Sequence, residues 1–281
     1  MRFALIGNER TEAQPELKGL CCCCSKLVIA KCGTQKIWHW AHKSKTDCDN
    51  WWEPETEWHR NWKNHYPEDW QEVSLLDKIT REKHIADVQT INSLVLEFQH
   101  SNINPQEQTS RELFYKNMVW IVDGTRLKRD YPRFLKELKS DGISEVRKTD
   151  KAGIFEVCFP EFCFPKAWLK RTVPVIFDFR GEGSINDSEG LRNNLYCLFP
   201  QIGRHAIVAE ISRKAFINAT INGAWTLRVQ EFIKEYRKQD EIKQRENRQI
   251  KSYSSNKGIY LWRGIPLIGG QKEYQKRRKR Q

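Results

Sequence analysis

The sequence has no continuous apolar run of about 18 residues, which is the length that a membrane-spanning helix needs. The first residues, MRFALIGNERTEAQ, contain too short an apolar stretch for a secretion signal. We therefore expect a cytoplasmic protein with no membrane partner. Aromatic residues are not scarce, because 11 Trp, 13 Phe and 8 Tyr occur among the 281 residues. That content excludes an intrinsically disordered chain.

Cysteine is abundant but unsuited to a disulfide framework. There are nine cysteines, an odd number, and four of them are consecutive at positions 21–24. Without a secretion signal, paired disulfides are not expected, and clustered thiols in a reducing compartment are better used for metal binding. The chain length suits about two domains with well-buried cores.

The formal charge of +12 is unevenly distributed. Residues 51–125 hold 7 Lys and Arg against 13 Asp and Glu, whereas residues 226–281 hold 16 against 6. A basic arm of this kind typically attracts nucleic acid, although it can also serve only for solubility. We predict that the arm contacts phosphate through Lys276, Arg277, Arg278, Lys279 and Arg280.

The pattern of apolar residues predicts an α/β protein. A helix is expected over 51–65, strands over 70–76, 83–91 and 94–100, a helix over 105–117 and a buried strand over 118–123. Asn92 and Ser93 suit a tight hairpin turn. Further along, the sequence predicts a helix over 130–139, strands over 154–159, 173–179 and 206–211, a loop over 181–190 and a charged helix over 226–251. The expected divisions are 1–50, 51–128, 129–225 and 226–281.

The first 50 residues are typical of a small zinc module. Cys21 and Cys24 form a C-x2-C pair, and His39 and His42 follow as an H-x2-H pair. Two short-spaced pairs are the usual way to supply the four ligands of a tetrahedral zinc ion. The thiols are interchangeable at this level, so each of several others can substitute: Cys22, Cys23, Cys32 or Cys48. The alternative is that these side chains only pack in a core.

A second group of residues predicts a divalent-metal centre. Glu55, His59 and Lys63 recur four residues apart and would share one helical face, while Asp87 and Glu97 would meet across the hairpin. Carboxylates of this kind hold Mg²⁺ or Mn²⁺. Gln99 would orient water or phosphate, and Lys63 or His59 would supply positive charge or help proton transfer. The alternative is a solvated acidic face.

The motifs at these residues, in order, are CCCCSKLVIAKCG, HWAH, ETEWHRNWK, HIADVQ, LEFQHSNI and SRELFYKNMVWIVDG. Together they resemble the competence protein CoiA-like family of the PD-(D/E)xK nuclease superfamily, over about residues 20–125. The resemblance implies a restriction-endonuclease-like mixed sheet flanked by helices, with an N-terminal zinc module. It does not reach residues 131–281, where the apolar pattern itself predicts a C-terminal α+β extension. It also implies that Arg111 and Tyr115 contact phosphate.

The chain departs from the family pattern at several positions. Cys22 stands where the family has proline, and Trp40 where it has phenylalanine. Gln99 matches the family pattern, although the lysine of the nuclease E-x-K motif is missing there. Glu57 is an alternative to Glu55, but it would face away from His59 and Lys63. These departures leave the role of the metal site open to test.

The sequence therefore predicts a metal-dependent DNA endonuclease, acting in DNA processing and recombination or in defence against phage. Its expected cofactors are structural Zn²⁺ and catalytic Mg²⁺ or Mn²⁺. The expected partners are DNA and either a second copy of the chain or an unknown protein. The first alternative is a non-catalytic nucleic-acid-binding adaptor with the same core. The second is a zinc-dependent hydrolase, which would need an open zinc position.

Overall fold

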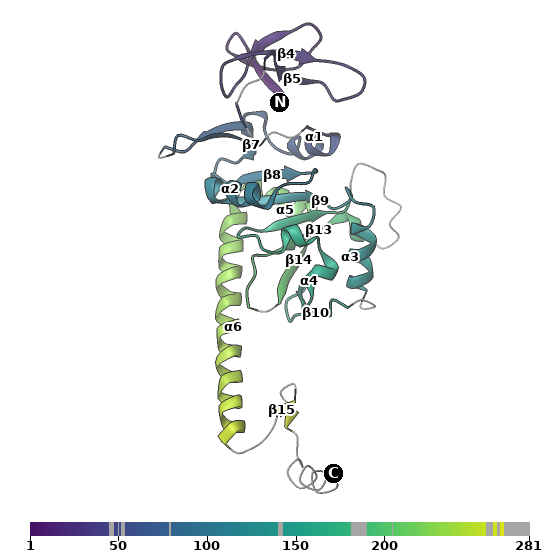
Figure 1. Cartoon of the computed structure of the whole chain (residues 1–281), viewed down its shortest axis with the longest axis vertical. Coiled ribbons are helices and arrows are strands. Elements are labelled where there is room, and N and C mark those ends of the chain that lie inside the picture. Colours follow the sequence, from purple (N-terminus) through teal and green to yellow (C-terminus); the bar gives the residue numbers. More distant parts are fainter. Residues whose placement is uncertain are drawn as a thin grey trace, which may run out of the picture. The chain divides into compact units, whose positions relative to one another are not determined.

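The computed structural model describes residues 1–44, 48–49, 51, 54–78, 80–139, 143–180, 190–203, 205–256, 261–262 and 265–266. The chain consists of two compact units, Met1–Gln230 and Glu231–Gln281. The first unit contains two sheets, marked in Figure 1 by β4 and β5 for the smaller sheet and by β7 to β14 for the larger one.

The smaller sheet is antiparallel and has the strand order β2-β1-β3-β4-β5. Its strands are β1 (Phe3–Ile6), β2 (Glu9–Glu12), β3 (Lys18–Leu20), β4 (Leu27–Lys31) and β5 (His39–His42). Trp40 is its central side chain, 1% exposed, and its ring N–H donates to the carbonyl of Thr11 at 2.9 Å. Cys21, Cys23 and Val28 pack in the same core. Two of the four consecutive cysteines, Cys21 and Cys23, are therefore buried in this small hydrophobic core.

The larger sheet has nine strands in the order β10-β11-β14-β13-β12-β9-β8-β7-β6. Strands β8, β9 and β12 are mutually parallel, and the other neighbours are antiparallel. The strands are β6 (Gln71–Leu76), β7 (Lys83–Gln89), β8 (Val95–Gln99), β9 (Met118–Asp123), β10 (Val146–Lys148), β11 (Ile154–Val157), β12 (Val175–Asp178), β13 (Asn194–Leu198) and β14 (Ala206–Ser212).

The helices are α1 (Glu57–Lys63), α2 (Pro105–Tyr115), α3 (Asp130–Leu138), α4 (Pro160–Cys163), α5 (Arg213–Ile221) and α6 (Ala224–Asn256), with short 3₁₀ turns at Glu68–Trp70, Lys166–Trp168 and Leu191–Asn193. A two-stranded ribbon, β15 (Leu261–Trp262) and β16 (Ile265–Pro266), belongs to the second unit. None of the described helices is long and apolar enough to span a membrane.

The mixed α/β class is confirmed, and the hairpin between β7 and β8 lies where the sequence predicts it. The backbone N–H of Thr90 donates to Leu94 at 2.9 Å, and Ser93 adopts a left-handed conformation with φ of 59°. This turn brings Val88 opposite Leu96, and the positions of Asp87 and Glu97 follow from that register. The turn chemistry thus positions both carboxylates.

Helix α1 is shorter than the helix predicted over 51–65. Thr56 caps it: its side chain accepts from the backbone N–H of His59, and the His59 ring accepts in return from the Thr56 N–H. This capping box starts the helix at Glu57 rather than near Pro54. Glu55 therefore precedes the helix, and its carboxylate does not follow the helical spacing that the sequence suggested.

Strands β10 and β13 and helix α5 were not predicted. The larger sheet also continues across the predicted division between residues 128 and 129, because β9 pairs in parallel with β12. The charged helix predicted over 226–251 lies within α6. Most of the predicted loop, residues 181–189, and the basic arm Lys276–Arg280 lie outside the described residues.

Candidate metal and carboxylate sites

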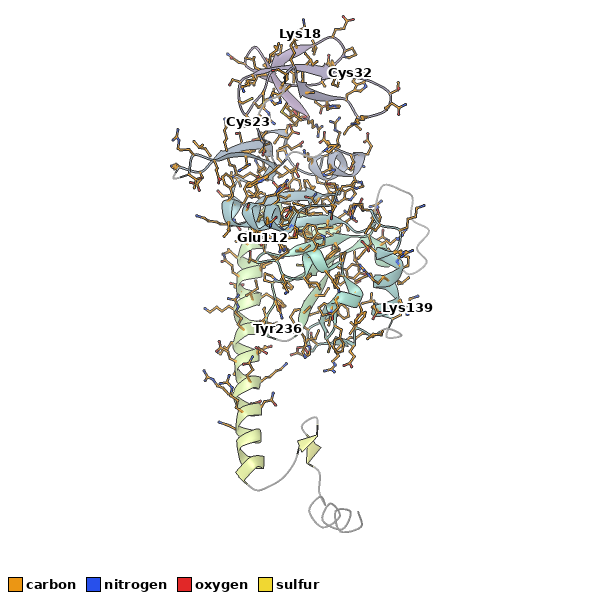
Figure 2. The ribbon with its side chains drawn as sticks, in the orientation of Figure 1. Lys18, Cys23, Cys32, Glu112, Lys139 and Tyr236 are labelled. Atoms are coloured by element: carbon orange, nitrogen blue, oxygen red, sulfur yellow. The ribbon has the colours of Figure 1, made fainter. Side chains whose placement is uncertain are left out.

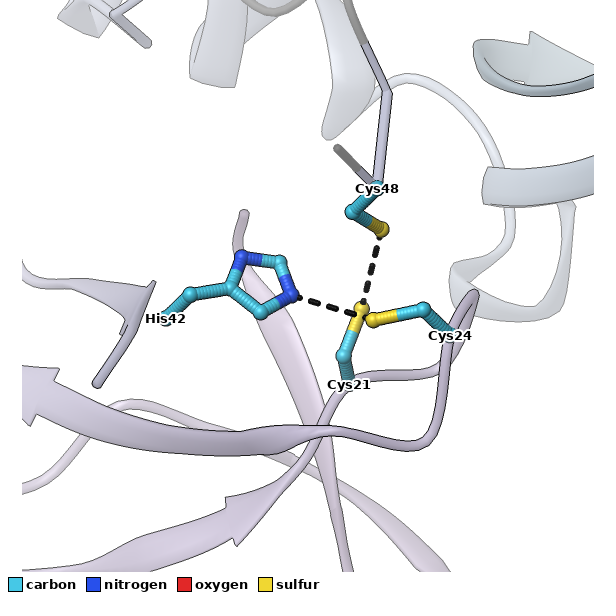
Figure 3. Close-up of side chains that lie close together, drawn as sticks. All are labelled: Cys21, Cys24, His42 and Cys48. Atoms are coloured by element: carbon cyan, nitrogen blue, oxygen red, sulfur yellow. Dashed lines mark hydrogen bonds between the residues drawn. The ribbon is translucent and has the colours of Figure 1, made fainter. Parts of the chain in front are cut away.

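Four side chains of the smaller sheet and its exit segment form a candidate metal site, called here the Cys/His cluster. It consists of Cys21, Cys24, His42 and Cys48, and their ligand atoms all lie within 4.8 Å of one another (Figure 3). The two sulfur atoms of Cys21 and Cys48 are 3.7 Å apart, and Nε2 of His42 is 3.2 Å from Sγ of Cys24. A tetrahedral zinc ion with Zn–S bonds of about 2.3 Å sets sulfur atoms about 3.8 Å apart. The donor set and spacing therefore fit structural zinc.

The loop between β3 and β4 explains why Cys21 and Cys24 converge. The N–H of Ser25 donates to the carbonyl of Cys21, and Ser25 takes a left-handed φ of 57°. The N–H of Cys23 also donates to Sγ of Cys21 at 3.4 Å. This tight turn returns the chain so that residues three apart present both thiols to one point.

His39, predicted as a zinc ligand, lies outside the cluster, and Cys48 takes its place. His39 and His42 occupy the two ends of strand β5, and residues three apart in a strand point to opposite faces. His42 shares the inner face with Trp40, whereas the His39 ring hydrogen-bonds the carbonyl of Ile37 at 2.9 Å. The structure therefore brings together one histidine and three thiols, including Cys48, which the sequence also offers as a ligand; a zinc-binding role for His39 stays a prediction.

The protonation preferences of the cluster suit metal binding. Burial, with Lys26 and the chain's amino terminus, lowers the pKa of His42, so its ring is neutral near pH 7. Burial opposes ionisation of Cys24, but the backbone of Lys26 and the neighbouring thiols lower its pKa below the usual value. Burial raises the pKa of Cys21 and of Cys48. A bound cation would be needed to keep those two thiols ionised.

The smaller sheet is fastened to the larger one beside this cluster. The N–H groups of Arg2 and Phe3 donate to the Glu72 carboxylate, at 2.7 and 3.2 Å. Figure 2 labels Cys23 on the side of the smaller sheet nearest the β6–β7 hairpin, where Lys83 donates to the Cys23 carbonyl. Glu72, at a left-handed φ of 49°, thus anchors the N-terminal residues to the larger sheet.

A cavity of about 350 Å³ lies between the two sheets and is called here the carboxylate cavity. One wall includes His42, Cys48 and Asp49 from the N-terminal part. The other wall carries the charged residues Glu55, Lys63, Glu72, Asp87, Glu97 and Arg111. The Cys/His cluster and the predicted carboxylates therefore border the same space.

Lys63 is the centre of the charge network in this cavity. Its Nζ lies 3.0 Å from Asp87, 3.2 Å from Glu72 and 3.3 Å from Glu55. Its side chain is 4% exposed, and these carboxylates raise its pKa well above the ordinary value despite burial. The cavity therefore concentrates negative charge on one buried cation.

Asp87 and Glu97 meet across the hairpin, as the sequence predicts, but both are held by protein donors. Asp87 Oδ2 accepts from the N–H of Phe98 at 3.0 Å, and Glu97 Oε1 accepts from the N–H of Asp87 at 3.3 Å. The guanidinium of Arg111 donates to Glu97 Oε2 at 2.6 Å. Burial and then Asp87 raise the pKa of Glu97 to about 8, against the opposing effect of Arg111.

His59 positions the helix instead of facing the cavity with a free nitrogen. Its Nε2 hydrogen-bonds the carbonyl of Phe98 at 2.8 Å, and its Nδ1 lies 2.9 Å from the Thr56 hydroxyl. The side chain is 2% exposed. His59 therefore ties α1 to β8 while lining the carboxylate cavity, and its predicted part in proton transfer stays a prediction.

An unpredicted carboxylate, Asp178, holds α1 from the other side. Its Oδ2 accepts from the ring N–H of Trp58 at 3.1 Å and of Trp62 at 3.0 Å. Arg213 binds both carboxylate oxygens, at 3.1 and 2.5 Å. Asp178 ends an apolar run, VIFD, in the same way that Asp123 ends MVWIVD, and that repeated pattern was the available signal.

Three further residues, which the sequence predicts to contact water or phosphate, have other contacts in the structure. Gln99 ends β8, donates its amide to Ser101 at 3.3 Å and lines a different cavity. Arg111 is 7% exposed and is engaged by Glu97, Glu107 and the carbonyl of Trp51. Tyr115 is 9% exposed, and burial raises its pKa well above the usual value. Because α2 turns this face toward the sheet, Arg111 and Tyr115 pack near Glu97, with Arg111 in the lining of the carboxylate cavity, and a phosphate contact stays a prediction for both.

Among the residues that the structure describes, the Cys/His cluster is the one group of three or more His, Cys, Asp or Glu side chains with such closely gathered ligand atoms. The carboxylates of the cavity are instead interleaved with Lys63 and Arg111. Lys63 and Arg111 offset only part of their charge in the described arrangement, since the pKa of Glu97 is still raised to about 8.

Comparison with known proteins agrees with the N-terminal part. Residues 8–50 match the family described as "Competence protein CoiA, N-terminal domain". This match confirms the resemblance to the CoiA-like family and contains all four residues of the Cys/His cluster. No curated protein matches the chain, and no solved structure matches it.

Proposed function

We propose that this CoiA-like chain is a divalent-metal-dependent DNA nuclease whose catalytic centre is the carboxylate cavity. The observation that carries the proposal is the convergence of Glu55, Asp87 and Glu72 on Lys63, with Glu97 alongside. Buried carboxylates are costly unless cations compensate them. A cluster of buried carboxylates in a cavity between two sheets therefore suits the binding of a cation.

The donors of this cavity suit a hard cation. Mg²⁺ and Mn²⁺ prefer carboxylate oxygens, and Asp87 with Glu97 would hold one of them. The raised pKa of Glu97 supports this, because the carboxyl lacks enough compensating charge to ionise at its ordinary pH. When bound, such a metal lowers the pKa of a coordinated water and neutralises charge on the phosphodiester.

The chain's own residues have distinct roles in this proposal. Lys63 supplies a fixed positive charge that faces the phosphate and offsets the acidic cavity. Arg111 orients Glu97 through the 2.6 Å hydrogen bond, and Asp87 is oriented by the N–H of Phe98. Glu55 keeps Lys63 and Arg60 in place, with its carboxylate 2.7 Å from the Arg60 guanidinium.

Zinc would have a structural role. Four protein ligands in a Cys₃His set leave no position for water, which argues against a zinc-dependent hydrolase. Cys48 and Asp49 are consecutive, and Asp49 accepts from the N–H of Ile85 on β7 at 2.8 Å. A zinc ion on Cys48 would therefore fix the segment that closes one wall of the carboxylate cavity.

The experiment compares cleavage and binding in matched variants. Asp87→Ala and Glu97→Gln should lose metal-dependent cleavage of a labelled DNA duplex while retaining DNA affinity. Asp69→Ala and Glu57→Gln change exposed carboxyl groups outside the cavity and should cleave normally. Thermal unfolding of each variant separates loss of chemistry from loss of fold. Cleavage by a folded Asp87→Ala protein at the wild-type rate would overturn the assignment.

A second candidate function is a non-catalytic nucleic-acid-binding adaptor. The observation that favours it is the saturation of the two key carboxylates by Lys63, Arg111 and backbone N–H groups. If those pairs are permanent, no coordination position opens for a metal. This candidate predicts salt-sensitive DNA binding without cleavage in Mg²⁺ or Mn²⁺, and identical behaviour of Asp87→Ala.

A further inference from the structure

A second cavity, of about 260 Å³, lies at the carboxyl ends of the three parallel strands and is called here the strand-end cavity. Its walls come from the segment after β8 (99–103), the segment after β9 (122–127) and the α4 region (163–168). Ligands of α/β sheets characteristically bind just beyond the carboxyl ends of parallel strands. Glu97 lines the carboxylate cavity, whereas Gln99, two residues later, lines this one.

The interior of the strand-end cavity is lined by buried aromatic side chains. Trp168, Phe177 and Phe179 line it, and all three are at most 6% exposed. Gly124 passes directly against Phe179, since a Cβ at this position would lie 2.4 Å from the ring. Aromatic walls of this kind accept a planar ring, and stacking on them is tolerant of which base is bound.

The polar part of the wall is fixed as well. The His100 ring lies 2.8 Å from Asp123 Oδ2, and the other oxygen of Asp123 accepts from the N–H of Thr125 at 2.8 Å and from its hydroxyl at 2.6 Å. Asp123 is 5% exposed. The cavity therefore presents an oriented His–Asp pair beside its apolar walls, a combination typical of sites that recognise a small heterocycle.

Three cations line the same cavity: Arg126, Arg133 and Lys166. Within the part of the chain that the structure describes, neither Arg126 nor Lys166 forms an ion pair within 4 Å, and Nε of Arg133 is buried without a hydrogen-bond partner. Two carboxylates line the cavity: Asp130 pairs with Arg133 at 3.0 Å, and Asp123 faces His100 at 2.8 Å. The three cations exceed these two carboxylates, so the mouth suits an anionic group.

We propose that the strand-end cavity binds a single nucleotide, with the base among the aromatic side chains and the phosphate at Arg126, Arg133 and Lys166. The volume is just below the range of about 300 Å³ and more for drug-sized sites, which suits one nucleotide better than a longer ligand. The same chemistry is present in a free mononucleotide and in the terminal nucleotide of a DNA strand. This inference goes beyond the proposed function, because binding at this cavity does not require cleavage.

The test is calorimetric titration of the full-length protein with dAMP, deoxyadenosine, inorganic phosphate and a short single strand with or without a 5′-phosphate. The double variant Arg126→Ala/Lys166→Ala should weaken dAMP binding at least about tenfold, the loss expected on removing charge-assisted contacts. The matched control, Lys128→Ala/Lys170→Ala, changes exposed residues of the same two segments that do not line the cavity. It should bind dAMP as the wild type does.

The titrations with DNA strands show whether the bound nucleotide is free or at a strand end. The Asp87→Ala variant shows whether this cavity is independent of the nuclease centre. Phosphate-dependent binding of the strand, lost in the double variant, would identify a strand end; binding of dAMP alone would identify a free nucleotide. Asp87→Ala should leave dAMP affinity unchanged, so loss of nuclease activity and loss of this site are distinguishable. No dAMP binding, equal affinity for phosphate and dAMP, or unchanged affinity in the double variant would overturn the proposal.

Discussion

The ammonium group of Lys63 lies 3.0 Å from the carboxylate of Asp87, and it joins helix α1 to strand β7 inside the carboxylate cavity. The same ammonium pairs with Glu55 and Glu72. One buried side chain therefore holds three carboxylates from different segments together in this cavity. Whether the ammonium shares the cavity with a metal or takes the place of one separates the two candidate functions.

Replacing Lys63 by methionine tests whether the carboxylates around it can bind a divalent metal. Lys63→Met leaves three carboxylates without their shared cation, which should destabilise the protein at neutral pH by about 3–5 kcal/mol. If the carboxylates can bind a divalent cation, Mn²⁺ should raise the melting temperature of Lys63→Met by more than it raises that of the wild type. The measurement is thermal unfolding with and without Mn²⁺. The lack of any Mn²⁺-dependent shift in both proteins would show that the carboxylates do not take the metal.

The Cys/His cluster predicts which substitutions release zinc. The purified wild type should carry about one zinc ion per chain. Cys48→Ala should lose most of it, because Cys48 supplies one of the four gathered ligands. His39→Ala should retain it, because His39 lies outside the cluster. Metal analysis of the two variants decides between the structure and the H-x2-H prediction, and loss of zinc only from His39→Ala would favour the latter.

Because the pKa of Glu72 is lowered in the folded protein, we expect the protein to lose stability in acid. Lys63, the amino terminus and the N–H groups of Arg2 and Phe3 outweigh burial and lower the pKa of Glu72 from 4.5 to about 2. A folded-state pKa below the unfolded value gives stability that is complete above pH 4.5 and is lost as the pH falls toward 2. The difference corresponds to about 3 kcal/mol.

Unfolding measured between pH 2 and 6 checks this contribution. Glu72→Gln should be less stable than the wild type at pH 6, and the two should converge as the pH approaches 2. Glu57→Gln, an exposed change on α1, should follow the wild-type curve. A constant difference between wild type and Glu72→Gln across this range would rule out the assigned ionisation.

Because Asp178 binds Arg213 as well as the tryptophans of α1, we expect the effects of substitutions at Asp178 and Arg213 on stability to be coupled. Asp178→Asn removes the buried charge that pairs with half-buried Arg213, and a loss of about 2–3 kcal/mol is expected. Arg213→Met alone should also destabilise, and the double variant should lose less than the sum of the two, because the pair is in direct contact. Chemical denaturation of the four proteins gives the coupling. Additive losses would mean that Arg213 does not compensate Asp178.

The local features of this fold were accessible from the sequence because they depend on near neighbours. The β7–β8 hairpin followed from the turn at Ser93 and from the alternation around it, and this placed Asp87 beside Glu97. The C-x2-C pair likewise depends on a short turn. In each case, a few consecutive residues determine the geometry.

The features that were missed depend on long-range packing. Cys48 replaces His39 because strand β5 turns the two histidines to opposite faces, and a spacing rule cannot report that the segment is a strand. Glu72 and Asp178 contact residues 70 and 120 positions away. Their only local signal is a charged residue at an otherwise apolar strand, which also marks many solvated positions.

The most direct test of the account is whether the wild-type chain cuts DNA. Linear, supercoiled and single-stranded DNA would be incubated with the protein in Mg²⁺, in Mn²⁺ and in EDTA at a concentration and time at which zinc analysis shows the Cys/His cluster still loaded. The account predicts cleavage of at least one of these forms with either metal and none with EDTA. DNA binding without cleavage of any form, with either metal, would contradict it.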